Sequence, residues 1–208
     1  MPVHQLKHPL ISDRLAVLRD IRTSSLEFRS AVDQISGFLA YELAATLSTR
    51  EREVTTPLGT ALCTTVDRER VVIVPILRAG LGLLPGVQRV FPTAPVLHLG
   101  IYRDEASLEP VFYYRKMSTD LRGKSVVLLD PMLATGGTIT AAADMLQKEA
   151  PANLSILALI ASRPGLSLVA ERFPDVAIFA GAVDSELDDR GFIVPGLGDA
   201  GDRMFGTE

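Results

Sequence analysis

The residues best suited to chemistry in this chain are an acid and a glycine-rich loop at positions 130–138. Asp130 follows four apolar residues, 126–129, which predict a short strand buried on both faces. Two glycines between two threonines come next, and apolar residues at helical spacing start at Ile139. Glycines let main-chain N–H groups approach a ligand, and a helix N-terminus adds free donors. This order predicts a phosphate site beside a carboxylate that suits sugar hydroxyls.

Two better-known nucleotide motifs do not fit the chain. No lysine follows the glycines at 136 and 137, so the loop is not the P-loop that binds ATP. The sequence Gly80-Leu81-Gly82 does not make a dinucleotide fingerprint, because the third glycine is one position late and the next strand ends in Arg103. A bare Thr-Gly-Gly-Thr also occurs in ordinary strand-to-helix turns, so the loop alone leaves a structural interpretation open.

Strands and helices alternate along the chain from residue 71 onward. The apolar runs predict strands at 71–77, 96–102, 126–129, 154–161 and 176–180, with a helix near 165–172. This alternation predicts an α/β fold with a mainly parallel sheet flanked by helices. Ligands of such sheets bind beyond the carboxyl ends of the strands. Arg78, Arg103 and Asp130 lie at those ends and should converge on one crevice.

The remaining segments predict accessory elements around this sheet. Helices are expected at about 12–22 and 24–47, followed by a hairpin at 53–63 that turns at 57–59. Residues 104–117 predict an exposed hairpin, and loops of that length are often functional. With 208 residues, 47% of them hydrophobic, the chain should form a single domain over 1–208.

The C-terminal stretch 191–207 contains five glycines and allows two interpretations. Such a composition is typical of a flexible tail. The apolar residues Ile193, Val194, Met204 and Phe205 would instead anchor the stretch against the fold, which a tail does not need.

Four stretches resemble motifs of a known family. Residues 127–138 resemble the phosphoribosyl diphosphate (PRPP) motif of the type I phosphoribosyltransferase family, in the form with Pro131 that is found in uracil phosphoribosyltransferases. Residues 74–82 and 100–105 resemble two further motifs of that family, and 195–202 resemble its uracil-binding loop. The resemblance runs from about residue 8 to 207. It departs at Asp188, at Phe192 and at 163–165, where relatives usually carry Asn, Tyr and Pro-Glu-Gly.

The resemblance implies transfer of the 5-phosphoribosyl group from PRPP to N1 of uracil, which gives UMP and diphosphate. It implies a β-hairpin cover from 104–117 and a Mg²⁺ ion held mainly through PRPP rather than by protein ligands. Asp130, Arg103 and Asp199 would be catalytic. PRPP would be bound by Arg78, Arg103, Asp130, Pro131, Met132, Leu133, Ala134, Thr135, Gly136, Gly137, Thr138 and Asp199. Uracil would be bound by Ile193, Gly198, Asp199 and Ala200.

Composition and charge indicate which partners, cellular location and oligomeric state to expect. The formal net charge of −4 argues against a nucleic-acid surface. The absence of a long apolar run or signal-like start predicts no membrane partner and a cytoplasmic location. One cysteine, Cys63, and three scattered histidines exclude a disulfide and a histidine metal site. The high apolar content favours a homodimer or larger homo-oligomer, and GTP activation stays open.

One alternative function uses the same fold without catalysis. A phosphoribosyltransferase fold can act as a nucleotide-sensing, RNA-binding regulator, because fold alone does not determine function. Such a protein needs a basic face, whereas this chain is acidic and its base loop is intact.

Overall fold

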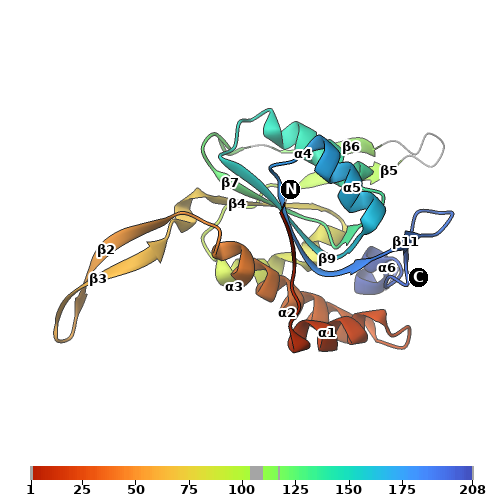
Figure 1. The fold of residues 1–208 in the computed structure, drawn as a ribbon, viewed down its shortest axis with the longest axis horizontal. Coiled ribbons are helices and arrows are strands. Elements are labelled where there is room, and N and C mark those ends of the chain that lie inside the picture. Colours follow the sequence, from red (N-terminus) through yellow and green to blue (C-terminus); the bar gives the residue numbers. More distant parts are fainter. Residues whose placement is uncertain (1, 104–109, 117, 208) are drawn as a thin grey trace.

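The fold is built on one mainly parallel sheet, seen in a computed structural model that describes residues 2–103, 110–116 and 118–207 (Figure 1). The strands lie in the order β1-β10-β9-β7-β4-β5-β6, and β8 also pairs with β9. Every described pair of this sheet is parallel except β5 with β6. The strands are β1 (Val3–Gln5), β4 (Val71–Leu77), β5 (Leu99–Arg103), β6 (Pro110–Arg115), β7 (Ser125–Leu129), β8 (Met132–Leu133), β9 (Asn153–Ser162) and β10 (Ala177–Asp184).

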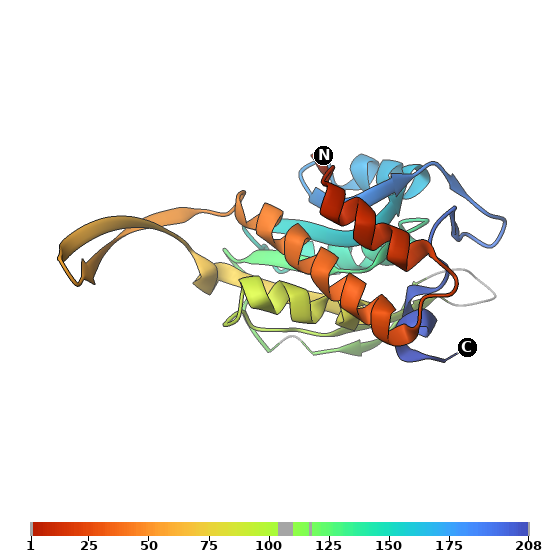
Figure 2. The same ribbon diagram turned by 90° about the horizontal axis from the view of Figure 1, so that it is seen from below.

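The continuous apolar runs of the sequence become strands because helices cover both faces of the sheet. Helices α1 (Pro9–Arg19), α2 (Ser25–Ala44) and α3 (Leu84–Val90) lie together on one side, as Figure 2 shows. Helices α4 (Gly137–Gln147) and α5 (Arg163–Arg172) cover the other side. A strand buried on both faces gains from apolar residues at every position. The predicted parallel sheet flanked by helices is thereby confirmed.

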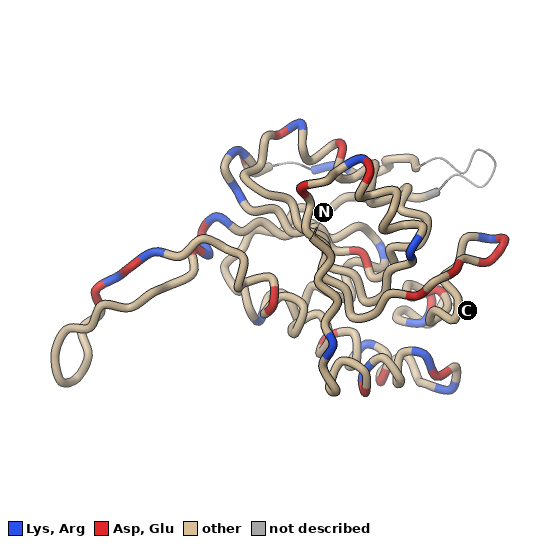
Figure 3. The backbone as a smooth tube through the Cα atoms, viewed as in Figure 1, with Lys and Arg blue, Asp and Glu red and all other residues tan. Residues whose placement is uncertain are grey.

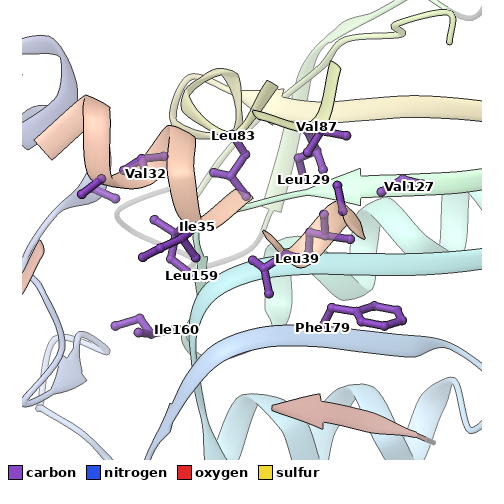
Figure 4. Packing of buried hydrophobic residues seen from close by; sticks show 14 of the residues in the cluster. Val32, Ile35, Leu39, Leu83, Val87, Val127, Leu129, Leu159, Ile160 and Phe179 are labelled. Atoms are coloured by element: carbon purple, nitrogen blue, oxygen red, sulfur yellow. The ribbon is translucent and has the colours of Figure 1, made fainter. Parts of the chain in front are cut away.

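The larger core lies between α2 and the sheet. Val32, Ile35 and Leu39 of α2 are fully buried and pack toward sheet residues such as Leu129 and Phe179 (Figure 4). Helix α2 begins with a capping box: the Ser24 hydroxyl accepts from Glu27 N–H, and the Glu27 carboxylate accepts from Ser24 N–H. This reciprocal cap satisfies two free donors of the helix and fixes its start close to the predicted position.

Several predicted boundaries were wrong. Helix α1 starts at Pro9 instead of 12, because proline suits the first helical turn and the His8 ring caps it. Strand β5 starts three residues later than predicted, because Val96 makes only an isolated bridge with Ile73. Strand β10 continues to Asp184, four residues past its predicted end, in parallel register with β9. Strand β1 was not predicted, since three residues are too short to show a pattern.

The predicted hairpin at 53–63 exists but is longer, and it projects from the body as an arm (Figures 1 and 2). Strands β2 (Thr49–Thr56) and β3 (Gly59–Val66) pair antiparallel along their full length. Within β2, the residues from Arg50 to Glu53 alternate between positive and negative charge (Figure 3). Because β2 is exposed on both faces, it lacks the alternating apolar pattern that would have revealed its true length.

The C-terminal stretch packs against the fold, so the flexible-tail interpretation was wrong. It forms β12 (Ile193–Val194), which pairs with β11 (Glu186–Leu187), and then α6 (Ala200–Phe205). Ile193, Leu197 and Met204 are buried. None of the helices in the described ranges has the length and apolar character needed to span a membrane.

Candidate active site

A cavity of about 340 Å³ lies at the carboxyl ends of β4 and β7, where the sequence placed the site. Four separate segments meet in it: the end of β4, strand β5, the segment from Asp130 to the start of α4, and the C-terminal stretch. Its lining residues are Ile76, Leu77, Arg78, Ala79, Ile101, Asp130, Met132, Ala134, Thr138, Arg190, Gly191, Phe192, Ile193, Gly198, Asp199, Ala200 and Gly201. The acid, the glycine-rich loop and the C-terminal glycines, far apart in sequence, therefore face one space.

The loop before α4 has the form expected of a phosphate site. Gly136 lies in the left-handed region with φ 87°, and α4 begins at the next residue. Helix α4 has 11 residues, enough to present free N–H groups at its start. Of the nine residues predicted at 130–138, four line the cavity: Asp130, Met132, Ala134 and Thr138. The other five, Pro131, Leu133, Thr135, Gly136 and Gly137, are not among the lining residues.

The loop is tied to the sheet and to α5 by contacts that the sequence did not reveal. Within it, β8 pairs with β9, which places Met132 beside Ile160. The buried Ser162 hydroxyl donates to the Ala134 carbonyl at 2.6 Å and accepts from Gly165 N–H at 2.9 Å. Ser162 thus caps α5 and supports the loop at once. A serine two positions before Pro164 was the local signal for this cap.

Gly165→Ala should weaken binding of the phosphorylated substrate. A Cβ there would lie 2.2 Å from the Ala134 carbonyl oxygen and 3.0 Å from that of Leu133, so the loop backbone must move. Overpacking of this kind costs about 1–3 kcal/mol. The expected result is a rise of about tenfold or more in KM for the phosphorylated substrate, measured by steady-state kinetics.

The matched control is Gly37→Ala in α2, where the nearest atoms to the added Cβ are 3.6 Å away. That variant should keep wild-type KM values, because α2 lies away from the cavity. Equal KM values for the phosphorylated substrate in the two variants would show that the position of the loop does not depend on Gly165.

Asp130 is an acid of raised pKa on the cavity wall. Burial raises the pKa of Asp130 to about 7, and the nearby Asp199 carboxylate adds to the rise, while Met132 N–H opposes it. Met132 N–H donates to Asp130 Oδ1 at 3.4 Å. The residue is half-buried: it faces the cavity, and protein surrounds its other sides. Two carboxylates on one wall make the site favourable for positive charge.

Arg78 brings a cation to the cavity, at the end of β4. Its Nη2 lies 3.1 Å from Asp202 Oδ1, and its side chain is 59% exposed. An exposed ion pair of this kind is weak and can exchange partners. Arg103 ends β5, as predicted, but its side chain lies outside the described residues, as does the 104–109 part of the predicted cover. The role of Arg103 therefore stays a prediction.

The four predicted uracil-binding residues, Ile193, Gly198, Asp199 and Ala200, all line the cavity. Asp199 caps α6, its Oδ1 accepting from Asp202 N–H at 3.0 Å. Sequence reasoning missed Arg190 as a site residue: its guanidinium lies 5.1 Å from the centre of the Phe192 ring, and both line the cavity. The only signal was its position just before the base loop.

The fold and site together define the phosphoribosyltransferase class: a parallel sheet, a glycine-rich phosphate loop after a central strand, and a second ligand segment facing that loop. The structure of a hypoxanthine-guanine phosphoribosyltransferase from Bacillus anthracis shares the fold, with a TM-score of 0.52 at 11% identity over 76% of this chain and 80% of that chain.

The chain belongs to the uracil phosphoribosyltransferase family, whose model matches residues 5–207. It is 45% identical over 206 residues to uracil phosphoribosyltransferase of Clostridium kluyveri, covering 99% of each chain. The corresponding enzyme of Symbiobacterium thermophilum is 45% identical over 203 residues, 98% of this chain and 97% of its own. The AQ2163 protein of Aquifex aeolicus has a TM-score of 0.94 at 41% identity over 99% of both chains. The resemblance seen in the sequence motifs is confirmed.

Proposed function

We propose that this chain transfers the 5-phosphoribosyl group from PRPP to N1 of uracil, giving UMP and diphosphate. The observation that carries the proposal is one cavity lined both by the phosphate loop and by the glycine-dense base segment. These are the two halves that a nucleotide-forming reaction must bring together. Family membership supports the same reaction.

The phosphate loop binds the 5-phosphate of PRPP in this proposal. Main-chain N–H groups at the start of α4 and the hydroxyl of Thr138, which lines the cavity, donate to the phosphate oxygens. Pro131 and Leu133 are buried and hold the loop in place, while Gly136 supplies the left-handed turn. The ribose is thereby fixed for attack at its C1′ carbon.

Asp130 and Asp199 act where positive charge develops. As the bond from C1′ to diphosphate breaks, the ribose becomes electron-poor, and a carboxylate nearby stabilises that charge. Asp130 accepts hydrogen bonds from the ribose hydroxyls, and Asp199 contacts PRPP. Arg78 and Arg103 bind the diphosphate, so Arg78 exchanges its exposed pair with Asp202 for the phosphate oxygens.

The cavity fits a Mg²⁺ ion that arrives with PRPP. Within residues 2–103, 110–116 and 118–207, no group of three or more histidine, cysteine and acidic side chains could hold a metal ion. Two carboxylates, Asp130 and Asp199, do face the cavity, and oxygen ligands suit Mg²⁺ when substrate phosphates complete the set. When bound, the ion neutralises charge on the departing diphosphate.

The base segment selects uracil through main-chain donors. Uracil presents acceptors at O2 and O4 and a donor at N3, whereas cytosine reverses the pattern at positions 3 and 4. Main-chain N–H groups of 198–200 cannot become acceptors, and a main-chain carbonyl that accepts from uracil N3–H, such as that of Ile193, cannot become a donor. Cytosine would therefore leave buried groups unpaired at positions 3 and 4, at a cost of about 1–3 kcal/mol each. The Phe192 ring lines the same cavity and offers an apolar face to the base.

A panel of bases tested with PRPP checks this function. The expected kcat/KM for uracil exceeds that for cytosine at least about 30-fold, because two mismatched groups cost at least about 2 kcal/mol. Hypoxanthine should not react. Comparable rates for uracil and cytosine would contradict main-chain selection, and RNA binding in a gel-shift assay with no turnover of any base would favour the regulator instead.

Three finer expectations belong to the same proposal: a single domain over 1–208, a homodimer or larger homo-oligomer, and a cytoplasmic location. Exposed apolar side chains on the β2–β3 arm, among them Leu58 and Leu62, support self-association. The acidic surface and the single cysteine are consistent with the cytoplasm. Whether GTP activates the enzyme is decided by assays with and without it.

A further inference from the structure

An ion pair at the end of β10 holds the turn that leads to the base segment. Arg19, the last residue of α1, donates from Nη1 and Nη2 to the two carboxylate oxygens of Asp184 at 2.8 and 2.7 Å. The Asp184 side chain is 9% exposed and the Arg19 side chain 27%. A bidentate ion pair of this kind fixes the geometry of both side chains.

Both main-chain polar groups of Gly196 are bound by this pair. The Gly196 carbonyl accepts from Arg19 Nη1 at 2.8 Å, and Gly196 N–H donates to Asp184 Oδ2 at 3.1 Å. Gly196 has φ 59°, and a Cβ there would lie 2.0 Å from the Ile193 carbonyl oxygen. The turn therefore lies directly against Ile193, which lines the cavity, so its orientation is linked to the cavity wall.

A second arginine holds the next residue of the same turn. Arg203 donates to the Leu197 carbonyl at 2.9 Å and to main-chain carbonyls at the end of α1. Its guanidinium lies 4.4 Å from the centre of the Phe28 ring, which keeps it in place. Arginines thus hold two consecutive carbonyls, those of Gly196 and Leu197, immediately before the chain reaches the proposed base contacts.

The pair acts at a distance from the substrate. Neither Arg19 nor Asp184 is among the residues that line the cavity. We propose that the Arg19–Asp184 pair is a positioning device: it fixes Gly196 so that the N–H groups of 198–200 face the pyrimidine, and it thereby sets the affinity for uracil. This inference rests on the function proposed above.

Arg19→Lys tests the device without leaving Asp184 unpaired. A lysine keeps the charge but lacks the planar guanidinium with its several N–H donors. It therefore cannot bind both carboxylate oxygens and the Gly196 carbonyl in the same geometry. The expected result is a rise of about fivefold or more in KM for uracil, with KM for PRPP and kcat within about twofold of wild type. The control is Arg14→Lys on the same helix, whose partner Asp13 is 60% exposed, and it should change neither constant.

Hydrogen exchange provides a readout that needs no substrate. Amides in peptides covering 193–199 should exchange faster in Arg19→Lys than in wild type or Arg14→Lys, while peptides covering 130–138 keep their rates. If wild type turns over no base, the proposed function has failed, and the exchange data still decide whether the pair holds the turn.

Two outcomes overturn the inference. One is unchanged exchange at 193–199 in a folded Arg19→Lys protein, and the other is a rise of both KM values together, which would indicate a general structural role. If Arg19→Lys does not fold, Asp184→Asn takes its place, because asparagine still accepts from Gly196 N–H but lacks the charge that holds Arg19. In Asp184→Asn, KM for uracil should again rise while KM for PRPP stays close to wild type.

Discussion

Asp130→Asn should lower kcat/KM at least about tenfold, and by as much as the 10²–10³-fold typical of a lost electrostatic contact to a transition state. Asparagine keeps the size of the side chain and an acceptor for Met132 N–H, which donates to Oδ1 in the native protein. It removes the charge that we propose stabilises the electron-poor ribose, and it replaces the second acceptor oxygen with an NH2 donor. Initial rates at pH 8.5 with both substrates varied give the comparison, because Asp130, with a pKa of about 7, is then ionised.

The control for this variant is Asp120→Asn, an exposed carboxylate paired with Arg122. It should keep wild-type rates, since it lies on the surface. The pH profile adds a second check: kcat/KM of wild type should fall as pH drops through about 7 and Asp130 takes up a proton, and Asp130→Asn should lack this limb. Wild-type turnover by Asp130→Asn would refute the electrostatic role.

The same substitution should stabilise the fold at high pH. Burial raises the pKa of Asp130 above its ordinary value of 3.8, so the folded chain binds the proton more tightly than the unfolded chain does. The stabilising effect of that proton is complete below pH 3.8 and is lost as pH rises toward 7. Asp130→Asn should therefore melt at a higher temperature than wild type at pH 8, with the difference shrinking toward pH 4.

Removing Mg²⁺ with a chelator should stop turnover completely. The leaving diphosphate carries several negative charges, and two arginines alone do not replace a divalent ion at its oxygens. The fold should survive, because the described residues contain no metal-holding group of three or more side chains. Enzyme assays in excess EDTA, with circular dichroism of the same samples, measure both effects.

Adding Mg²⁺ in excess of the chelator should restore the full rate, which controls for damage to the protein. Turnover that persists in EDTA would show that the ion is dispensable. Loss of the far-ultraviolet signal would instead indicate a structural metal site in the chain.

The parts of the fold that follow from local pattern could be predicted. The run 126–129 predicted β7 because a strand covered on both faces is apolar at every position. Asp130 and the glycines after it predicted the phosphate loop because their order along the chain carries the chemistry. The four residues predicted to bind uracil came from a resemblance to a family motif, and they line the same cavity as part of that loop.

Contacts between distant segments could not be predicted. Ser162 and Ala134 are 28 positions apart, and Arg19 and Asp184 are 165 apart, so no periodic pattern marks either pair. The full length of the β2–β3 arm was missed for another reason: β2 has no buried face, and burial is what produces alternation. Arg190 was missed because an arginine that follows two acids is usually a solvated surface residue.

The two loop supports lie side by side in the sheet, since Ser162 of β9 is in register with Asp184 of β10. Ser162 holds the loop proposed to bind the sugar phosphate, and Asp184 holds the turn that leads to the proposed base contacts. Neighbouring strands of a sheet are spaced about 4.8 Å apart. The phosphate loop and the base segment are thus both tied to adjacent, hydrogen-bonded strands before either proposed substrate binds. In the proposed reaction, substrate binding has to release Arg78 from Asp202, but it does not have to bring the loop and the base segment together.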